Sequence, residues 1–201
     1  MNPYTSKFLE GLWEGGADFA LAEKRLKKEC RSMKAPEAGV IGRDLLLRKR
    51  ALYNKTFNLA AFLASDSLAG NDGFMDFADC VAILPEDRYE AILNNPDVLV
   101  DEPVSAEFFE GYLVRQVCDV FDKSLFGKAD GEQFLDYLVF GEEDGIDWDE
   151  MAGWTEEFAK ENLPKLYAEF GDLLKPRSSK PSSDRAGDSV ELKDLISDLD
   201  G

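Results

Sequence analysis

Apolar residues recur at helical spacing along almost the whole chain. Within residues 5–34 they follow an i, i+3, i+4 pattern, which places one apolar stripe along a helix. Comparable stripes occupy several further segments: 37–66, 72–84, 85–94, 105–123, 134–140 and 148–170. Val98-Leu99-Val100 is the one strand-like run, and three residues cannot form a sheet by themselves. The pattern therefore predicts an all-α fold, a single multi-helix, bundle-like domain over residues 4–174.

Glycine and proline divide this pattern into elements. Gly15-Gly16 is a weak point within the first stripe, because glycine lowers helix stability. Pro85 suits the first position of a helix, where its missing N–H costs nothing. Pro164 interrupts the closing helical part.

The composition changes after Leu174. Residues 175–189 are rich in Ser, Pro and charge and almost free of apolar residues, which predicts a disordered linker. Residues 190–199 then show a short amphipathic pattern, with apolar residues at 190, 192, 195, 196 and 199. This tail segment can dock on its own domain, bind in a partner's groove, or have no binding role.

Charge is unevenly distributed along the chain, whose net charge is -18. Residues 1–60 hold 12 Lys or Arg against 7 Asp or Glu, whereas residues 61–174 hold 6 against 28. A surface this acidic repels nucleic acid and anionic lipid and attracts cationic partners. We therefore expect a basic protein partner, with no direct nucleic-acid or membrane binding. The short run Arg48-Lys49-Arg50 is weak support for nucleic-acid binding against that background.

The residue inventory removes several chemistries. The chain has no histidine, so a Ser–His or Cys–His pair, a histidine metal site and an HExxH helix are all excluded. Cys30, Cys80 and Cys118 are widely separated and form no CxxC pair, so we expect three buried thiols. The N-terminus lacks the pattern of a secretory signal, and no apolar run is long enough to span a membrane. We expect a cytoplasmic protein that is not an enzyme and uses no cofactor.

Two carboxylate clusters are candidate binding sites. Asp72, Asp76 and Asp79 share one helix face by their spacing, which can be a solvated face or can hold a hard cation. The second cluster is the run 142–150, with Glu142, Glu143, Asp144, Asp147, Asp149 and Glu150, and its spacing does not fit a calcium loop. There Asp147, Asp149 and Glu150 are typical of a helix N-terminus. A partner-facing acidic patch and a metal site are the alternatives for this cluster.

Residues 5–100 carry a pattern found in a known family. The segments that carry this pattern are Tyr53-Asn54 through Ala60-Ala61, Asn71-Asp72-Gly73-Phe74-Met75-Asp76-Phe77, and Tyr89 through Asn94-Asn95-Pro96-Asp97-Val98-Leu99. They resemble domain-of-unknown-function family 4240, a bacterial family sometimes joined to a WGR domain. The chain has Phe57 or Asn58 and Cys80 where that family has tryptophans, and Pro85-Glu86-Asp87 replaces a glycine. The resemblance implies a helical fold and no established reaction, so it assigns no catalytic residue.

The sequence as a whole predicts a non-enzymatic acidic protein that binds a basic protein partner. Two specific versions are an immunity-type inhibitor of a toxin and a DNA mimic. The candidate partner-binding residues are the eight clustered carboxylates: Asp72, Asp76, Asp79, Glu142, Glu143, Asp144, Asp147 and Asp149. The alternatives are a carboxylate-ligated metal-dependent hydrolase and an acidic soluble protein with no special partner.

Overall fold

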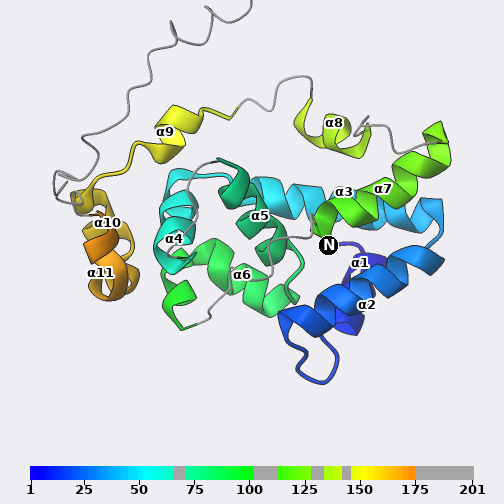
Figure 1. Ribbon diagram of the computed structural model, residues 1–201, viewed down its shortest axis with the longest axis horizontal. Helices are drawn as coiled ribbons and strands as arrows, with labels where there is room; N and C mark the ends of the chain where they lie inside the picture. The colour runs from blue at the N-terminus through cyan, green and yellow to red at the C-terminus, as the bar shows by residue number, and fades with distance from the viewer. Residues whose placement is uncertain (66–70, 102–112, 128–133, 142–145, 175–201) are drawn as a thin grey trace, which may run out of the picture.

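The fold is all-α, as predicted. A computed structural model describes residues 1–65, 71–101, 113–127, 134–141 and 146–174, and these contain helices and no strand (Figure 1). The α-helices are α1 (Pro3–Leu12), α2 (Phe19–Ser32), α3 (Ala35–Ala51), α4 (Lys55–Ser65), α5 (Asn71–Ala82), α6 (Glu86–Asn94), α7 (Leu113–Phe126), α8 (Phe134–Phe140), α9 (Trp148–Ala152), α10 (Glu156–Asn162) and α11 (Pro164–Phe170). Two 3-10 helices are η1 (Pro96–Val100) and η3 (Gly171–Leu174). The predicted linker 175–189 and tail segment 190–199 lie outside the described residues.

Side-chain caps and glycine conformations determine where several helices begin and end. Asp18 caps α2 by accepting the backbone N–H of Leu21 at 2.8 Å, and Thr155 caps α10 in the same way. Gly15 and Gly16 adopt φ values of 69° and 72°, a left-handed conformation that favours glycine. This confirms the predicted weak point, which separates α1 from α2.

The structure differs from the sequence prediction at two positions. The predicted helix 37–66 is two helices, because the chain turns at Asn54, whose side chain caps α4 by accepting the Phe57 N–H at 2.9 Å. The strand-like run Val98–Val100 belongs to the 3-10 helix η1. Asn95 starts this turn by accepting the backbone N–H of Asp97, and no described strand lies beside it to form a ladder.

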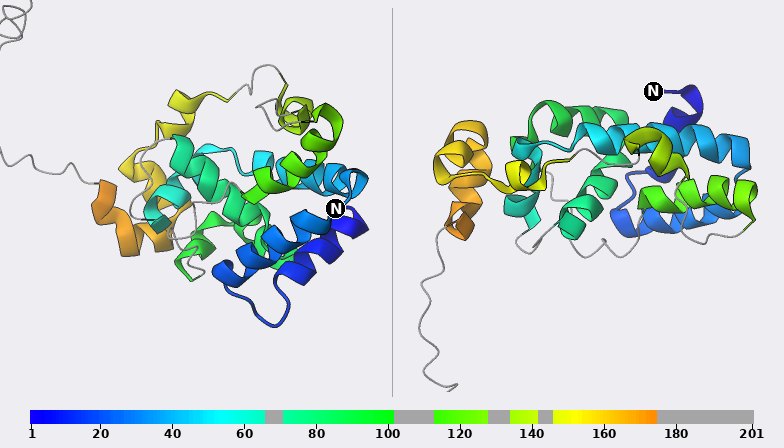
Figure 2. Two further views of the ribbon diagram at one scale, coloured as in Figure 1. Left: turned by 45° about the vertical axis from the view of Figure 1, so that its right-hand side comes forward. Right: turned by 90° about the horizontal axis from the view of Figure 1, so that it is seen from above.

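One continuous core of buried apolar side chains connects the helices, from Leu9 in α1 to Leu166 in α11. Helix α3 lies at its centre and packs against α1, α5, α7 and α8. Figures 1 and 2 show α9, α10 and α11 at one end of the molecule and α1 and α2 toward the other. The described molecule therefore has two distinct ends that share one core.

Two buried backbone carbonyls between α5 and α6 are satisfied by long-range side-chain donors. Trp13 Nε1 donates to the Ile83 carbonyl at 2.8 Å, and Arg48 Nη2 donates to the Leu84 carbonyl at 2.7 Å. An unpaired buried carbonyl costs more free energy than a single hydrogen bond normally gains. These bonds fix the α5–α6 connection to α1 and α3.

Asp97 fastens η1 to α11. Its carboxylate is 4% exposed and accepts the backbone N–H groups of Lys165 at 3.0 Å and Leu166 at 2.8 Å. These are the first donors of α11 after Pro164, and no residue of α11 itself caps them. The Asn-Pro-Asp segment therefore has a structural role here.

We predict that Asp97→Ala destabilises the protein by about 1–2 kcal/mol, because two helix N–H groups lose their acceptor. Urea unfolding measures the change. Asp101→Ala is the matched control: Asp101 is exposed and lies 3.4 Å from Lys165 Nζ, so its loss changes stability by less than about 0.5 kcal/mol. Equal destabilisation by both substitutions would contradict the capping role of Asp97.

Candidate functional site

The carboxylates predicted on α5 do not form one solvent-facing row. Asp79 is 3% exposed, Asp76 is partly exposed, and the Asp72 side chain lies outside the described residues. Every residue from Phe77 to Ala82 is buried, so the second half of α5 has no solvent face. The prediction that Asp79 binds a partner is therefore wrong, because α5 directs this side chain into the protein.

Asp79 forms an ion pair inside the core. Lys49 Nζ of α3 lies 2.6 Å from Asp79 Oδ1, and both side chains are largely buried. Burial raises the pKa of Asp79, while Lys49 and a backbone hydrogen bond from Val114 at the start of α7 lower it. Burial lowers the pKa of Lys49, but Asp79, Tyr53 and Asp136 together more than offset this, so the pKa of Lys49 is raised. The pair holds α3, α5 and α7 together.

Further charged groups surround this pair on α7 and α8. Arg115 Nε donates to Asp119 Oδ1 at 2.8 Å, and Arg115 Nη1 lies 3.8 Å from Asp136 Oδ2. Burial raises the pKa of Asp136, and Arg115 and Lys49 oppose that rise. Burial also raises the pKa of Tyr53 to about 12. A cluster of shifted pKa values is compatible with a catalytic site or with an internal ion network, and the alternation of charge here fits the network.

The second carboxylate cluster is described in part. Asp147 caps α9, since its Oδ1 accepts the Glu150 N–H at 2.8 Å, and Asp149 and Glu150 are exposed in the first turn. This confirms the predicted helix N-terminus. Glu142, Glu143 and Asp144 lie outside the described residues.

Aromatic contacts bring the two predicted carboxylate regions onto neighbouring helices. The Trp148 ring of α9 lies 6.1 Å from Phe74 of α5 and 6.0 Å from Tyr53. The first half of α5, with Asp76, is therefore adjacent to α9, with Asp149. Asp79 is excluded from this surface because it points toward α3.

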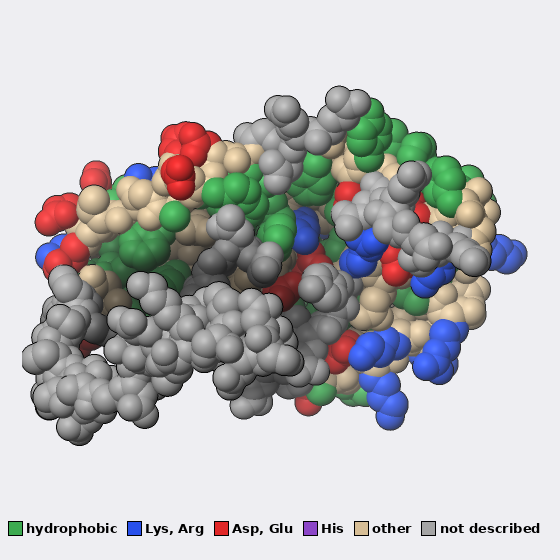
Figure 3. Space-filling view, turned by 45° about the horizontal axis from the view of Figure 1, so that its top comes forward, with side chains coloured by type: hydrophobic (Ala, Val, Ile, Leu, Met, Phe, Trp, Pro, Cys, Tyr) green, Lys and Arg blue, Asp and Glu red, His purple; other side chains and the backbone are tan. Residues whose placement is uncertain are grey.

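The structure adds exposed carboxylates that the two sequence clusters did not include. We define the acidic end as the exposed carboxylates of residues 147–172: Asp147, Asp149, Glu150, Glu157, Glu161, Glu169 and Asp172. Figure 3 shows carboxylates at this end and most of the visible Lys and Arg side chains toward the other. The sequence signal was the presence of only two cations within residues 147–174, which a search for dense runs of acidic residues overlooks.

Both cations on these helices have acidic neighbours. Lys160 Nζ lies 2.7 Å from Glu156 Oε1, and Lys165 Nζ lies 3.4 Å from Asp101 Oδ2. Glu156 also accepts a hydrogen bond from the Tyr167 hydroxyl at 2.5 Å. Neither lysine pairs with a carboxylate of the acidic end. These two lysines therefore do not neutralise the negative charge of the acidic end.

Comparison with known proteins finds no matching family model, no curated protein and no solved structure. The resemblance to domain-of-unknown-function family 4240 therefore stays a prediction. Across the described ranges, no three His, Cys, Asp or Glu side chains are grouped so that they can hold a metal ion. The same ranges contain no helix with the length and apolar character that crossing a membrane requires.

We predict that Lys49→Met destabilises the protein by about 3–5 kcal/mol, because it leaves the buried Asp79 without its cation. Urea unfolding of the double variant Lys49→Met/Asp79→Leu should recover a large part of the loss, because both charges are then removed. The exposed Lys7→Met substitution is the control and should have little effect. If the free-energy losses of the two single variants simply add in the double variant, the two groups do not depend on each other and the prediction is wrong.

We also predict that stability rises as the pH falls from neutral toward the ordinary aspartate pKa of 3.8. The folded-state pKa values of Asp79 and Asp136 are raised above the ordinary value of 3.8, so the folded state binds more protons than the unfolded chain. The free energy of unfolding therefore decreases as the pH increases through these pKa values. Urea midpoints measured across this range should show a shallower slope for Asp136→Asn than for the exposed control Asp149→Asn. Equal slopes would contradict the assignment to Asp136.

Proposed function

We propose that this protein is a non-enzymatic interaction protein whose acidic end binds a basic protein partner. The observation that carries the proposal is the separation of charge: seven exposed carboxylates lie on residues 147–172, and the two cations among them have partners elsewhere. A local excess of negative surface charge attracts a partner of opposite sign and raises the association rate.

The carboxylates at the acidic end are held by anchored helices. Trp154, which precedes α10, donates from Nε1 to Asn58 Oδ1 at 3.1 Å, and its ring lies 5.0 Å from Phe62 of α4. On α9, Trp148 contacts Phe74 in the core. Because the helices are fixed before binding, a partner has little backbone ordering to drive. This rigidity supports a docking surface over a merely solubilising one.

Two more specific versions of this function differ in what the partner normally binds. An immunity-type inhibitor would cover the cationic site of a toxin, whereas a DNA mimic would occupy a nucleic-acid-binding groove with carboxylates in place of phosphates. Duplex DNA should compete with this protein for its partner in the second case only. Each version is proposed for the cytoplasm, where the three separate thiols would remain reduced.

A metal-dependent hydrolase remains the alternative. The ion pair between Lys49 and Asp79 argues against the hydrolase, because a carboxylate that already contacts a lysine is a poor metal ligand. Titration calorimetry with Mg²⁺, Mn²⁺ and Ca²⁺ separates the two. Tight stoichiometric binding that Asp76→Ala abolishes would support the hydrolase.

We predict that the acidic-end variant Asp149→Asn/Glu157→Gln/Glu161→Gln loses its partner. The immobilised protein is first used at low and high salt to isolate a basic partner, and the association rate of the purified pair is then measured. We expect this variant to slow association by at least about tenfold, and wild-type association to slow steeply as salt rises.

The matched control is Glu10→Gln/Glu14→Gln/Glu29→Gln, which removes the same charge from exposed positions of α1, α2 and their connection. Its association rate should stay within about twofold of wild type. An equal loss in both variants would assign binding to net charge and contradict a local surface. Salt-independent association would contradict the electrostatic account.

A further inference from the structure

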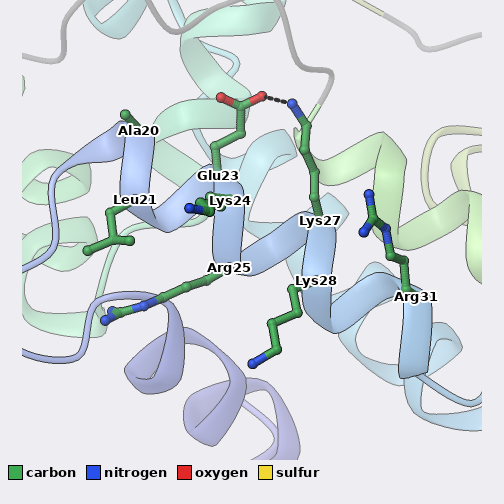
Figure 4. Close-up of a pocket in the computed structure, with 8 residues that line it drawn as sticks. All are labelled: Ala20, Leu21, Glu23, Lys24, Arg25, Lys27, Lys28 and Arg31. Atoms are coloured by element: carbon green, nitrogen blue, oxygen red, sulfur yellow. Dashed lines mark hydrogen bonds and ion pairs between the residues drawn. The ribbon is translucent and has the colours of Figure 1, made fainter.

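Helix α2 carries a basic surface on this otherwise acidic protein. Its exposed side holds Lys24, Lys28 and Arg31 together with the apolar side chains of Ala20 and Leu21 (Figure 4). These residues line an open groove of about 570 Å³, and Leu21 is 41% exposed. We call this set of five side chains the α2 groove. It combines positive charge with a small apolar contact area.

The cations of the α2 groove are available for binding. The other three residues that line this open groove already have partners: Lys27 is paired with Glu23, and Arg25 donates to the carbonyls of Leu12 and Glu14. By contrast, Lys24, Lys28 and Arg31 form no ion pair with any described residue. Of these three, only Arg31 lies in the last turn of α2, where a cation stabilises the helix dipole. The helix dipole therefore gives no structural reason for Lys24 and Lys28.

The tail of the same chain has the complementary composition. Residues 188–200 contain five carboxylates and a single lysine, and they include the apolar residues of the amphipathic pattern at 190–199. We propose that the tail segment 190–199 docks in the α2 groove of its own molecule. Glu191, Asp194 and Asp198 supply charge for the groove lysines, and the apolar residues cover Leu21.

The length of the linker permits this docking. Residues 175–189 form 15 links, which span at most about 50 Å when extended. A compact domain of about 170 residues has a radius of gyration of about 16 Å, so the linker reaches well beyond half the molecule. Tethering also makes docking intramolecular, so its strength depends on how closely the linker length matches the span to the groove.

The charge of the acidic end directs the tail toward α2. The chain leaves the described structure at η3, next to α10 and α11, where Glu169 and Asp172 are exposed. The linker itself carries Lys175, Arg177, Lys180 and Arg185, but the acidic segment 190–199 beyond it is repelled there and attracted by the groove. A docked tail would leave the acidic end uncovered, so this inference does not depend on the proposed function.

Carbodiimide cross-linking of the full chain tests the proposal, because this reagent joins carboxylates to lysine amines that are in contact. We expect amide links from Lys24 or Lys28 to Glu191, Asp194 or Asp198. A mixture of ordinary and ¹⁵N-labelled protein identifies the source of the tail: links within one molecule carry a single isotope. Links that carry both isotopes would assign the groove to a second copy and overturn the proposal.

Hydrogen exchange provides a second measurement that does not depend on cross-linking chemistry at lysine. Amides of residues 190–199 should exchange at least about tenfold more slowly than in the charge-reversed variant Lys24→Glu/Lys28→Glu. The control Lys7→Glu/Arg43→Glu makes the same change of net charge at exposed positions of α1 and α3 and should retain the protection. Unprotected tail amides in the wild type, or equal loss of protection in both variants, would overturn the proposal.

Discussion

The structure depends on three consecutive cations of the central helix α3, each of which fastens a different element. Arg48 donates to the Leu84 carbonyl and to Glu86 at the start of α6, and its guanidinium lies 3.8 Å from the centre of the Tyr89 ring. Lys49 pairs with Asp79 of α5, and Arg50 donates to the Val139 carbonyl of α8. Because adjacent residues point in different directions around a helix, one short run can connect three neighbours.

These contacts determine how the helices pack more specifically than apolar burial does. Phe57, Phe74 and Phe77 form a buried aromatic group between α4 and α5, and apolar burial of this kind has no preferred direction. The ion pair depends on distance, since displacement of Lys49 leaves Asp79 in the core without its cation. We infer that apolar burial supplies most of the stability and that the α3 cations select one arrangement of the helices.

Local chemistry made part of this structure predictable from sequence. The break at Gly15-Gly16 and the helix start at Asp147 follow from backbone preference and capping, which a few adjacent residues determine. The break between α3 and α4 is equally local, since Asn54 caps α4 three residues away, but the continuous apolar pattern of 37–66 obscured it. The burial of Asp79 is not local, because it depends on Lys49 from another helix. An amphipathic pattern shows which residues share a helix face, and the tertiary contacts decide whether that face meets water. The acidic end was missed for another reason, since its carboxylates are spaced through α9, α10, α11 and η3 and form no dense run after Glu150.

The use of cations inside the protein also explains its surface. Arg48 is buried and Lys49 is largely buried, so they neutralise carboxylates of the core and the α6 start and do not offset acid elsewhere. The other group of clustered cations lies on α2, far along the chain from residues 147–172. A chain that places 12 of its 23 basic residues within residues 1–60 and folds α1 and α2 away from α9, α10 and α11 (Figure 1) leaves the opposite end negative. The charge separation on which both proposed interactions rest is therefore a consequence of chain order and of the packing around α3.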